Sequence, residues 1–235
     1  MLIEYTLYGL FLLAIVFSAV AQIRVSTVFH RFSRVATASG RRAEEVALEM
    51  LHSAGIYHVR VERVRGHLTD HYDPTTGILR LSDTVYGQRT AAAIGVAAHE
   101  AGHAIQHATE YGPLRFRTRL VPIASFASNT SWILIFMGAL IMGFAGLFGG
   151  IGYYLMLGGI GLFSVTTLFQ LATLPCEFDA SRRALVAMRG MGYFSERELS
   201  DSKKVLSCAA MTYVAALLVS ILQLLRLIVM IRRDD

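Results

Sequence analysis

Residues 96–107 read VAAHEAGHAIQH and contain the pattern H-E-x-x-H. Positions i and i+4 of a helix lie on one face, so His99 and His103 can direct two imidazole nitrogens at one metal ion. Glu100 is turned to one side, where its carboxylate can reach a water molecule on that metal. These groups are the minimal set for zinc-dependent hydrolysis. The alternative is an ordinary surface helix that carries two histidines and a glutamate.

The residues around this pattern predict a helix, because the stretch from Thr90 to Ala108 is rich in alanine and contains no proline. A catalytic zinc site also needs a third protein ligand and an open position for water. His107 continues the i, i+4 series, but eight residues of helix rise about 12 Å. That span is too long for His99 and His107 to share one ion, so the third ligand must come from another part of the chain.

The composition is that of a membrane protein. The 235 residues are 54% hydrophobic and 17% charged, whereas soluble domains are roughly 25% charged. The net charge of +5 comes mostly from arginines that flank apolar segments, which is typical of membrane topology and not of nucleic acid binding. Two cysteines, Cys176 and Cys208, provide neither a disulfide framework nor a CxxC metal pair.

The first apolar segment, residues 5–23, has no charged residue and is long enough to cross a bilayer. A cleaved signal peptide is the alternative, since residues 19–21 (AVA) resemble a cleavage site. The preceding residues, however, carry Glu4 and no lysine or arginine, and the apolar stretch is long for a signal sequence. We therefore expect a transmembrane helix.

The arginines that follow this segment indicate its orientation. They are Arg24, Arg31, Arg34, Arg41 and Arg42. Because basic residues accumulate on the cytoplasmic side of membrane spans, this flank is predicted to be cytoplasmic.

A small α+β domain is predicted after the break at Gly40. The expected elements are an amphipathic helix at 41–54 ended by Gly55, a strand at 57–65, a turn at 73–77, and a strand at 78–82 followed by a cap at Ser82 or Asp83. Zinc peptidases commonly hold an extended substrate along a sheet edge, where backbone hydrogen bonds supply affinity. Residues 78–82 are a candidate for such an edge, and an ordinary small sheet that covers a helix is the alternative.

The chain contains no Asp, Glu, Lys or Arg between Arg119 and Glu177. This stretch is too long for one span and fits two helices, at 131–148 and 153–173, joined by a turn at 149–152. Its many glycines suit close helix packing in lipid.

Such a hairpin returns the chain to the side that it left. Glu177 is therefore expected on the same side as His99 and His103, which makes it the best candidate for the third ligand. The basic residues after Glu177 again indicate the cytoplasmic side. They are Arg182, Arg183, Arg189, Lys203 and Lys204.

The last part of the chain predicts one more long helix. Ser195 and Glu198 form a capping box after a break at Gly190 and Gly192. Residues 209–225 are apolar and predict a fourth span. Arg226, Arg232 and Arg233 would then lie on the outer side, so either they snorkel, or the last helix is interfacial, or the orientation is reversed.

Four stretches together resemble the YugP-type neutral zinc metallopeptidases. They are residues 68–74 (LTDHYDP), 81–82 (LS), 96–106 (VAAHEAGHAIQ) and 177–184 (EFDASRRA). The resemblance covers most of the chain and implies a multi-pass zinc peptidase of the gluzincin kind in a bacterial inner membrane. It implies one catalytic zinc ion, bound by His99, His103 and Glu177, with Glu100 as the catalytic base.

More distant families, the HtpX-like and prenyl-protein membrane proteases, look similar around a Glu-x-x-Ala-Asp motif. In this chain the residue four after Glu177 is Ser181, and the acid is Asp179 instead. It stays open whether Asp179 orients a ligand histidine, as such acids do. Asp179 is also the nearest rival of Glu177 as the third ligand, and a Cys176 thiolate is a further alternative.

The predicted site has a defined chemistry. Zinc lowers the pKa of a bound water molecule and polarises the scissile carbonyl, and Glu100 passes the water proton to the leaving amine. A further group should stabilise the tetrahedral oxyanion. The candidates are His71, Tyr193, Arg182 and Arg183. His67 and His71 also suggest a second metal site, although beside a turn a hydrogen-bonding role is the simpler interpretation.

The sequence thus predicts a mainly α, multi-pass membrane protein with about four transmembrane helices and a small α+β zincin-like metallopeptidase domain. The predicted parts are a transmembrane helix (1–23), a zincin-like domain with the H-E-x-x-H helix (24–119), a transmembrane hairpin (120–176), a segment with the third ligand and the capping box (177–207), and a transmembrane or interfacial helix (208–235).

The predicted function is zinc-dependent endopeptidase activity on membrane or membrane-proximal proteins, in water beside the bilayer and on the cytoplasmic side. A catalytically silent zinc-binding scaffold is the alternative, although a scaffold would not need Glu100. A transporter is a weaker alternative, because the membrane spans of transporters usually carry ionisable groups and the central hairpin has no Asp, Glu, Lys or Arg. The expected partners are a protein or peptide substrate and the bilayer, and not nucleic acid. Homo-oligomers or membrane partner proteins stay open.

Overall fold

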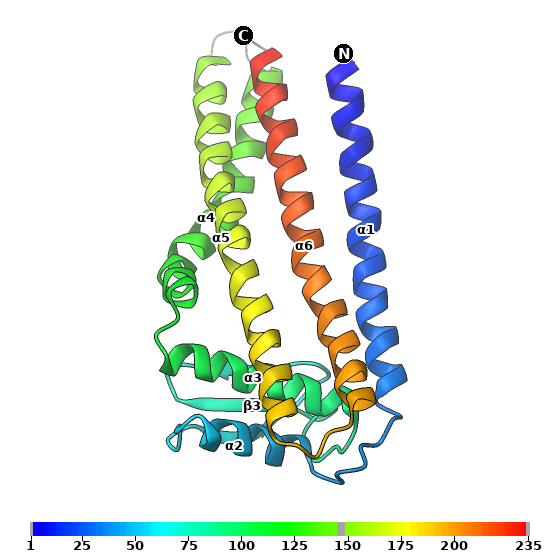
Figure 1. Ribbon diagram of the computed structural model, residues 1–235. Helices are drawn as coiled ribbons and strands as arrows, with labels where there is room; N and C mark the ends of the chain where they lie inside the picture. Colours follow the sequence, from blue (N-terminus) through cyan, green and yellow to red (C-terminus); the bar gives the residue numbers. More distant parts are fainter. Residues whose placement is uncertain (1, 145–148, 234–235) are drawn as a thin grey trace. The chain divides into compact units, whose positions relative to one another are not determined.

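The computed structural model describes residues 2–144 and 149–233 of the chain (Figure 1). The elements in these residues are α1 (Leu2–Phe32), α2 (Ala43–Ser53), β1 (Arg60–Val64), β2 (His71–Asp73), β3 (Ile78–Ser82), α3 (Ala91–Ala108), α4 (Gly112–Phe144), α5 (Gly149–Gly190) and α6 (Glu196–Arg233). Within the described ranges, α1, α4, α5 and α6 are long and apolar enough to cross a membrane. The predicted fold class, mainly α with about four membrane helices and a small sheet, is confirmed.

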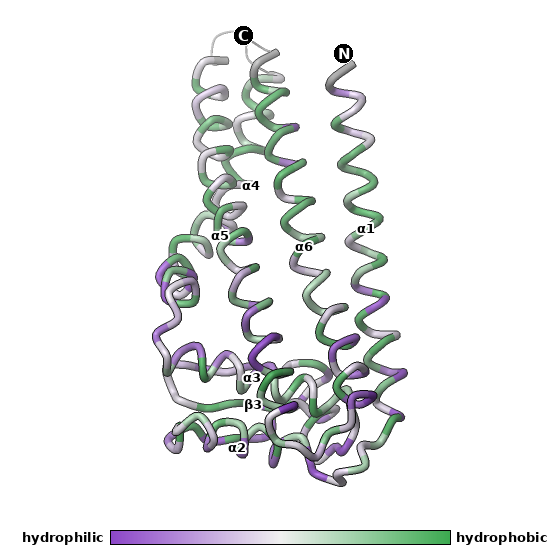
Figure 2. Tube along the Cα trace, viewed as in Figure 1, coloured by the Kyte–Doolittle hydropathy of each residue, from purple (hydrophilic) through white to green (hydrophobic). Residues whose placement is uncertain are grey.

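The chain divides into two compact units. Unit 1 comprises residues 1–20, 116–173 and 213–235, and unit 2 comprises residues 21–115 and 174–212. Each of the four long helices contributes residues to both units. Figure 2 shows that the helical segments of unit 1 are mostly hydrophobic, whereas hydrophilic residues are frequent along unit 2. Unit 2 contains α2, α3 and the sheet.

Glycines set the packing of α4 against α5 in unit 1. A Cβ atom at Gly138 would lie 2.7 Å from the carbonyl oxygen of Gly152, and one at Gly159 would lie 2.8 Å from that of Ser131. The two backbones are therefore in direct contact, as small residues allow in membrane helices. The turn predicted at 149–152 is wrong, because Gly152 packs on α4 from within α5. The connection between the two helices lies in residues 145–148, outside the described residues.

Arg226, one of three arginines whose position relative to the membrane stayed open from the sequence, contacts aromatic rings in unit 1. Its guanidinium carbon lies 4.0 Å from the ring centroid of Tyr8 and 4.4 Å from that of Phe11, both on α1. A guanidinium over an aromatic face is attracted by the ring quadrupole. This contact offsets part of the cost of placing a cation among apolar residues. The side chains of Arg232 and Arg233 lie outside the described residues.

The sheet in unit 2 has the strand order β1-β3-β2. Strand β1 is parallel to β3, and β2 is antiparallel to it. The sequence analysis missed β2, and its interpretation of β3 as an edge is wrong, because β3 is the central strand. The burial of β3 agrees with a central position, because four of its five residues are buried. Strand β2 is an edge strand of the sheet, and it contacts α3.

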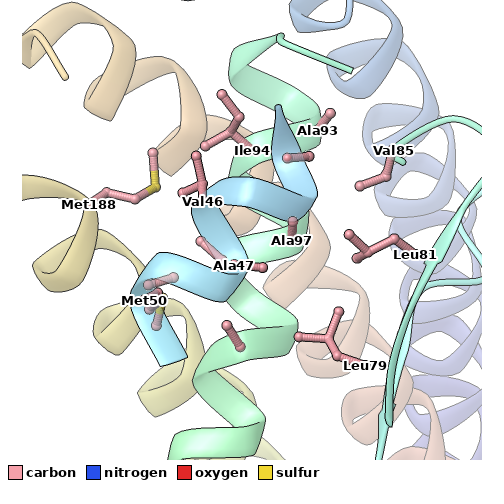
Figure 3. Close-up of a cluster of buried hydrophobic side chains, with 14 of the residues drawn as sticks. Val46, Ala47, Met50, Leu79, Leu81, Val85, Ala93, Ile94, Ala97 and Met188 are labelled. Atoms are coloured by element: carbon pink, nitrogen blue, oxygen red, sulfur yellow. The ribbon is translucent and has the colours of Figure 1, made fainter. Parts of the chain in front are cut away.

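Helix α2 packs across α3 and β3 to form the core of unit 2 (Figure 3). Met50 and Val46 of α2, Ile94 of α3 and Leu79 of β3 are fully buried. Full burial of one such side chain stabilises the fold by about 1.5–3 kcal/mol. Alanines on the facing side of α3 leave room for these larger side chains, and Figure 3 shows Ala97 among them. This core fixes the helix that carries the H-E-x-x-H pattern.

The ends of the helices in unit 2 are set by local signals. Gly55 follows α2 with a φ of 75°, in the left-handed region that favours glycine, as predicted. The capping box is also confirmed, because the Ser195 N–H donates to Glu198 at 2.7 Å and the Glu198 N–H donates to Ser195 Oγ at 3.3 Å. The predicted cap at Ser82 or Asp83 is wrong. Thr90 caps α3 by accepting the Ala93 N–H, since residues 82–88 form a hydrogen-bonded turn first.

Candidate metal centre

His99, His103 and Glu177 bring three metal-binding side chains together in unit 2. The two histidines lie one turn apart on α3, and their ring centroids are 4.7 Å apart. Glu177 comes from the part of α5 that belongs to unit 2. Its Oε2 atom lies 3.3 Å from His99 Nε2 and 3.5 Å from His103 Nε2. One potential ligand atom from each residue lies within 4.8 Å of the others.

This spacing fits a zinc ion. Two atoms that each bind a tetrahedral zinc at about 2.0–2.1 Å are about 3.4 Å apart, close to both of the nitrogen–oxygen distances. Glu177 is only 3% exposed, and a buried carboxylate requires positive charge or hydrogen-bond donors nearby. Burial lowers the pKa of His103, but Glu177 and Glu100 outweigh this effect and raise it. The surroundings therefore favour positive charge at this position.

Gly102, inside the H-E-x-x-H pattern, allows α5 to approach α3. A Cβ atom at Gly102 would lie 2.6 Å from the carbonyl oxygen of Ala180 and 3.2 Å from its Cα atom. Real Cβ contacts of this kind are not found, so the backbones can touch only where residue 102 has no side chain. Ala180 is itself fully buried. The contact lies one turn beyond Glu177 on α5 and brings its carboxylate to the two histidines.

Hydrogen bonds to the outer ring nitrogens orient both histidines. His99 Nδ1 lies 3.0 Å from Ser181 Oγ, and His103 Nδ1 lies 3.0 Å from Gln106 Oε1. Because the Gln106 oxygen can only accept, the proton of neutral His103 is on Nδ1 and the lone pair is on Nε2. The lone pair then faces Glu177. Outer-ring partners of this kind hold metal-binding histidines in the required tautomer.

Asp179 acts on the site through Gln106. The Gln106 amide donates to Asp179 Oδ2 at 3.0 Å and to the Cys176 carbonyl at 2.8 Å. Asp179 also accepts from Arg183 Nε at 2.6 Å and from Arg182. Asp179 itself has no described contact with either histidine, whereas Ser181, the residue at which the chain departs from the Glu-x-x-Ala-Asp pattern, contacts His99 directly. Among the described residues, the three-ligand cluster includes neither Asp179 nor Cys176.

Glu100 is held by the edge strand β2. Its Oε2 atom accepts the backbone N–H of Tyr72 at 3.1 Å. The Tyr72 hydroxyl lies 3.0 Å from His107 Nδ1, so His107 contacts β2 and is outside the ligand cluster. Burial raises the pKa of Tyr72 above the ordinary tyrosine value of about 10.

Asp70 anchors the start of β2 to the end of β3. Its carboxylate accepts the Ser82 N–H at 2.7 Å and the Ser82 hydroxyl at 2.9 Å. Burial raises the pKa of Asp70, and the negative charge of Glu100 adds to this effect, while the bonds from Ser82 oppose it. These bonds fix β2, and with it Tyr72, next to Glu100.

The predicted oxyanion candidates have other contacts. His71 Nδ1 lies 2.8 Å from the Thr69 carbonyl, and strand alternation points His71 away from the face on which Tyr72 meets α3. The Tyr193 hydroxyl donates to Glu49 at 2.9 Å, and burial raises its pKa to about 12. Neither side chain has a described contact with the three-ligand cluster. His67 contacts the rings of Phe29 and His30.

Sequence reasoning missed three residues of this site. Gln106 is three residues after His103 and Ser181 is four residues after Glu177, so helical spacing could have indicated both. Tyr72 gave no such signal, because β2 was not predicted and only tertiary contacts bring it to Glu100.

The comparisons with known proteins identify the family of the chain. Residues 7–232 match the family described as "Putative neutral zinc metallopeptidase". The chain belongs to this family. A relative from Bacillus subtilis (strain 168), "Putative membrane protease YugP", is 46% identical over 208 residues, which cover 88% of each protein. No solved structure matches the chain.

Membership of this zinc metallopeptidase family confirms the resemblance that the sequence suggested. It supports a protease function, and the family description implies zinc. Four apolar helices and the similarity to a membrane protease support a membrane protein.

Proposed function

We propose that the protein is an integral-membrane zinc-dependent endopeptidase that cleaves membrane or membrane-proximal proteins. The observation that carries the proposal is the convergence of His99, His103 and Glu177, with Glu100 beside them on the same helix. The two His–Glu distances of 3.3 and 3.5 Å match the ligand spacing of zinc. Family membership supports both the metal and the reaction class.

In this proposal His99, His103 and Glu177 would hold one zinc ion, which would act as a Lewis acid and lower the pKa of water. Glu100 accepts the proton of the attacking water and delivers it to the leaving amine. The Tyr72 N–H holds the Glu100 carboxylate in place. Ser181 and Gln106 keep the Nε2 atoms of both histidines directed toward Glu177.

We place the substrate along β2 instead of β3. In an antiparallel pair a residue exchanges both of its backbone hydrogen bonds with its partner or neither. The Tyr72 N–H points to Glu100, so the Tyr72 carbonyl also faces away from β3. An extended peptide could pair with this edge by β-augmentation, and its scissile bond would then lie close to Glu100.

Cleavage of casein in detergent tests the proposal, with wild type and Glu100→Gln measured side by side for zinc content and rate. We expect one zinc per chain in both proteins and a rate about 10²–10⁴-fold lower in the variant, the usual contribution of a general base. Glu110→Gln is the matched control, because Glu110 is exposed just after α3 and pairs with Arg115. It should cleave like wild type.

Two results would contradict the proposal. Cleavage by Glu100→Gln at the wild-type rate would remove Glu100 from the reaction. Wild type that is loaded with zinc but cleaves neither casein nor a panel of membrane proteins would favour the zinc-binding scaffold.

A further inference from the structure

A basic pocket lies between α1 and α6 within unit 2, apart from the ligands of the metal centre. Its volume is about 420 Å³. Four cationic side chains line it, together with the hydroxyls of Ser200 and Ser207. The cations are Arg24, Arg31, Lys203 and Lys204. None of its described lining residues is acidic.

Helical spacing explains why these cations face one another. Arg24, Val28 and Arg31 follow an i, i+4, i+7 pattern and form one stripe of α1. Ser200, Lys203/Lys204 and Ser207 form the corresponding stripe of α6. Arg31 and Lys204 both contact the ring of Phe32, at 5.5 and 5.4 Å from its centroid. Two of the four positive charges, one from each helix, are therefore held at the same aromatic side chain.

The protein neutralises this charge only in part. Lys204 pairs with the buried Asp201 at 2.8 Å. Among the residues that the structure describes, no carboxylate is found within salt-bridge distance of Arg24, Arg31 or Lys203. Like charges that line one pocket repel each other, so a bound anion would be attracted to the pocket.

The pocket lies where two apolar helical segments end. Residues 5–23 of α1 carry no charge and Arg24 comes next. On α6, residues 205–225 carry no charge and Lys204 precedes them. Charged residues at such ends lie at the level of the lipid headgroups. Val28 and Phe32 add apolar surface beside the cations. This apolar surface suits a ligand with an apolar part, and a free inorganic ion would make no use of it.

We propose that this pocket binds the headgroup of an anionic phospholipid. Arginine forks, lysine ammonium groups and serine hydroxyls are suitable donors for the oxygens of a phosphodiester. Basic pockets between transmembrane helices bind lipid headgroups in this way. The proposal concerns a surface distinct from the metal ligands, and it does not depend on protease activity.

Native mass spectrometry of the full chain in detergent tests the proposal by titration with phosphatidylglycerol or phosphatidylcholine of the same acyl chains. Wild type should bind phosphatidylglycerol more tightly. The double variant Arg24→Gln/Arg31→Gln should bind phosphatidylglycerol about 25-fold more weakly than wild type, because the loss of each positive charge lowers the affinity about fivefold. Arg60→Gln/Arg65→Gln is the control, since it removes the same charge from exposed positions on or beside β1. It should bind like wild type.

A second variant guards against misfolding. Arg24→Lys/Arg31→Lys keeps both charges and should retain most of the preference, and Lys203→Gln should lose about fivefold. Equal binding of both lipids by wild type, or equal losses in the pocket and control variants, would overturn the proposal. Displacement of the lipid by millimolar inorganic phosphate would assign the pocket to a free anion instead.

Discussion

Both halves of α5 contact a neighbouring helix at glycines, but the two contacts have different consequences. In unit 1, residues 149–173 meet α4 through Gly152 and Gly159, and the buried Thr167 hydroxyl pairs with Ser220 at 2.7 Å. In unit 2, residues 174–190 meet α3 at Gly102 and carry Glu177 and several charged neighbours. The absence of a side chain brings backbones into contact in both places. Among the described residues, the groups from different helices that fit a metal site are those that this approach brings together in unit 2.

This difference indicates what each region tolerates. Packing in unit 1 depends on small residues at the helix crossing, and polar contacts are secondary. The proposed metal centre depends on close approach and on a connected set of hydrogen bonds that runs from Asp179 through Gln106 to His103. A substitution that separates the helices or breaks these hydrogen bonds should therefore lower zinc affinity in unit 2. A comparable substitution at a helix crossing in unit 1 should leave zinc affinity unchanged.

The largest effect is expected from Gly102→Ala. Its new Cβ would lie 2.6 Å from a backbone oxygen, and overpacking of this kind costs about 1–3 kcal/mol of unfolding free energy. The variant should also lose zinc affinity, because α5 is pushed from α3. Gly159→Ala, with its Cβ 2.8 Å from the Ser131 carbonyl, should be destabilised similarly but keep its zinc. Thermal melting and metal analysis of both proteins make the comparison.

Gly161→Ala is the control for these variants. No atom lies within 4 Å of its added Cβ, and alanine is favoured over glycine inside a helix. Unchanged zinc affinity in Gly102→Ala would show that the close approach of α5 is unnecessary for the site.

A smaller effect is expected from Gln106→Leu. The leucine removes both the acceptor for His103 and the donor to Asp179 while it keeps the residue buried. Loss of such supporting hydrogen bonds typically lowers metal affinity 10–100-fold. Competition with a zinc-binding dye measures this change, and Gln88→Leu, at an exposed position before α3, should leave the affinity unchanged. Equal affinities in the two variants would contradict the positioning role of Gln106.

Ser181→Ala should lower zinc affinity by about tenfold, the lower end of the same range, because a single hydrogen bond to His99 is lost. Ser181→Asp should recover it, since an aspartate can accept the His99 N–H at the same position. The same dye competition provides the readout. If Ser181→Ala binds zinc as tightly as wild type, the contact is incidental.

The smallest effect concerns Asp73 at the end of β2. The hydroxyls of Thr75 and Thr76 and the Arg80 guanidinium lower its pKa. A lowered pKa stabilises the folded state above the ordinary carboxyl pKa of about 3.9, and this stability is lost as pH falls below that value. Asp73→Asn should therefore melt lower than wild type at pH 7, with a difference that shrinks toward pH 3. A constant difference across that range would exclude the ionised carboxylate as its source.

The sequence predicts the parts of this site that have local signals. His99, Glu100 and His103 share one helical turn, and Glu177 follows a long uncharged stretch. The predicted end of the second hairpin helix at residue 173 is wrong, because α5 continues through Pro175 to Gly190. Hydropathy marks where a helix stops being apolar and not where it stops being a helix.

The remaining parts depend on contacts between distant residues. Strand β2 has only three residues, and its pairing with β3 and the bonds between Asp70 and Ser82 define it. Its sequence, His-Tyr-Asp, has no strand pattern of its own. The substrate edge was for this reason assigned to β3, whose apolar residues instead indicate a buried central strand.

The zinc content of Glu177→Ala and Asp179→Ala, purified side by side with wild type, tests most directly whether α5 supplies the third ligand. Glu177→Ala should lose the metal under conditions in which wild type holds one ion. Asp179→Ala should bind zinc more weakly yet still reach one ion per chain at higher concentration. Full zinc occupancy in Glu177→Ala, or complete loss in Asp179→Ala alone, would contradict the assignment.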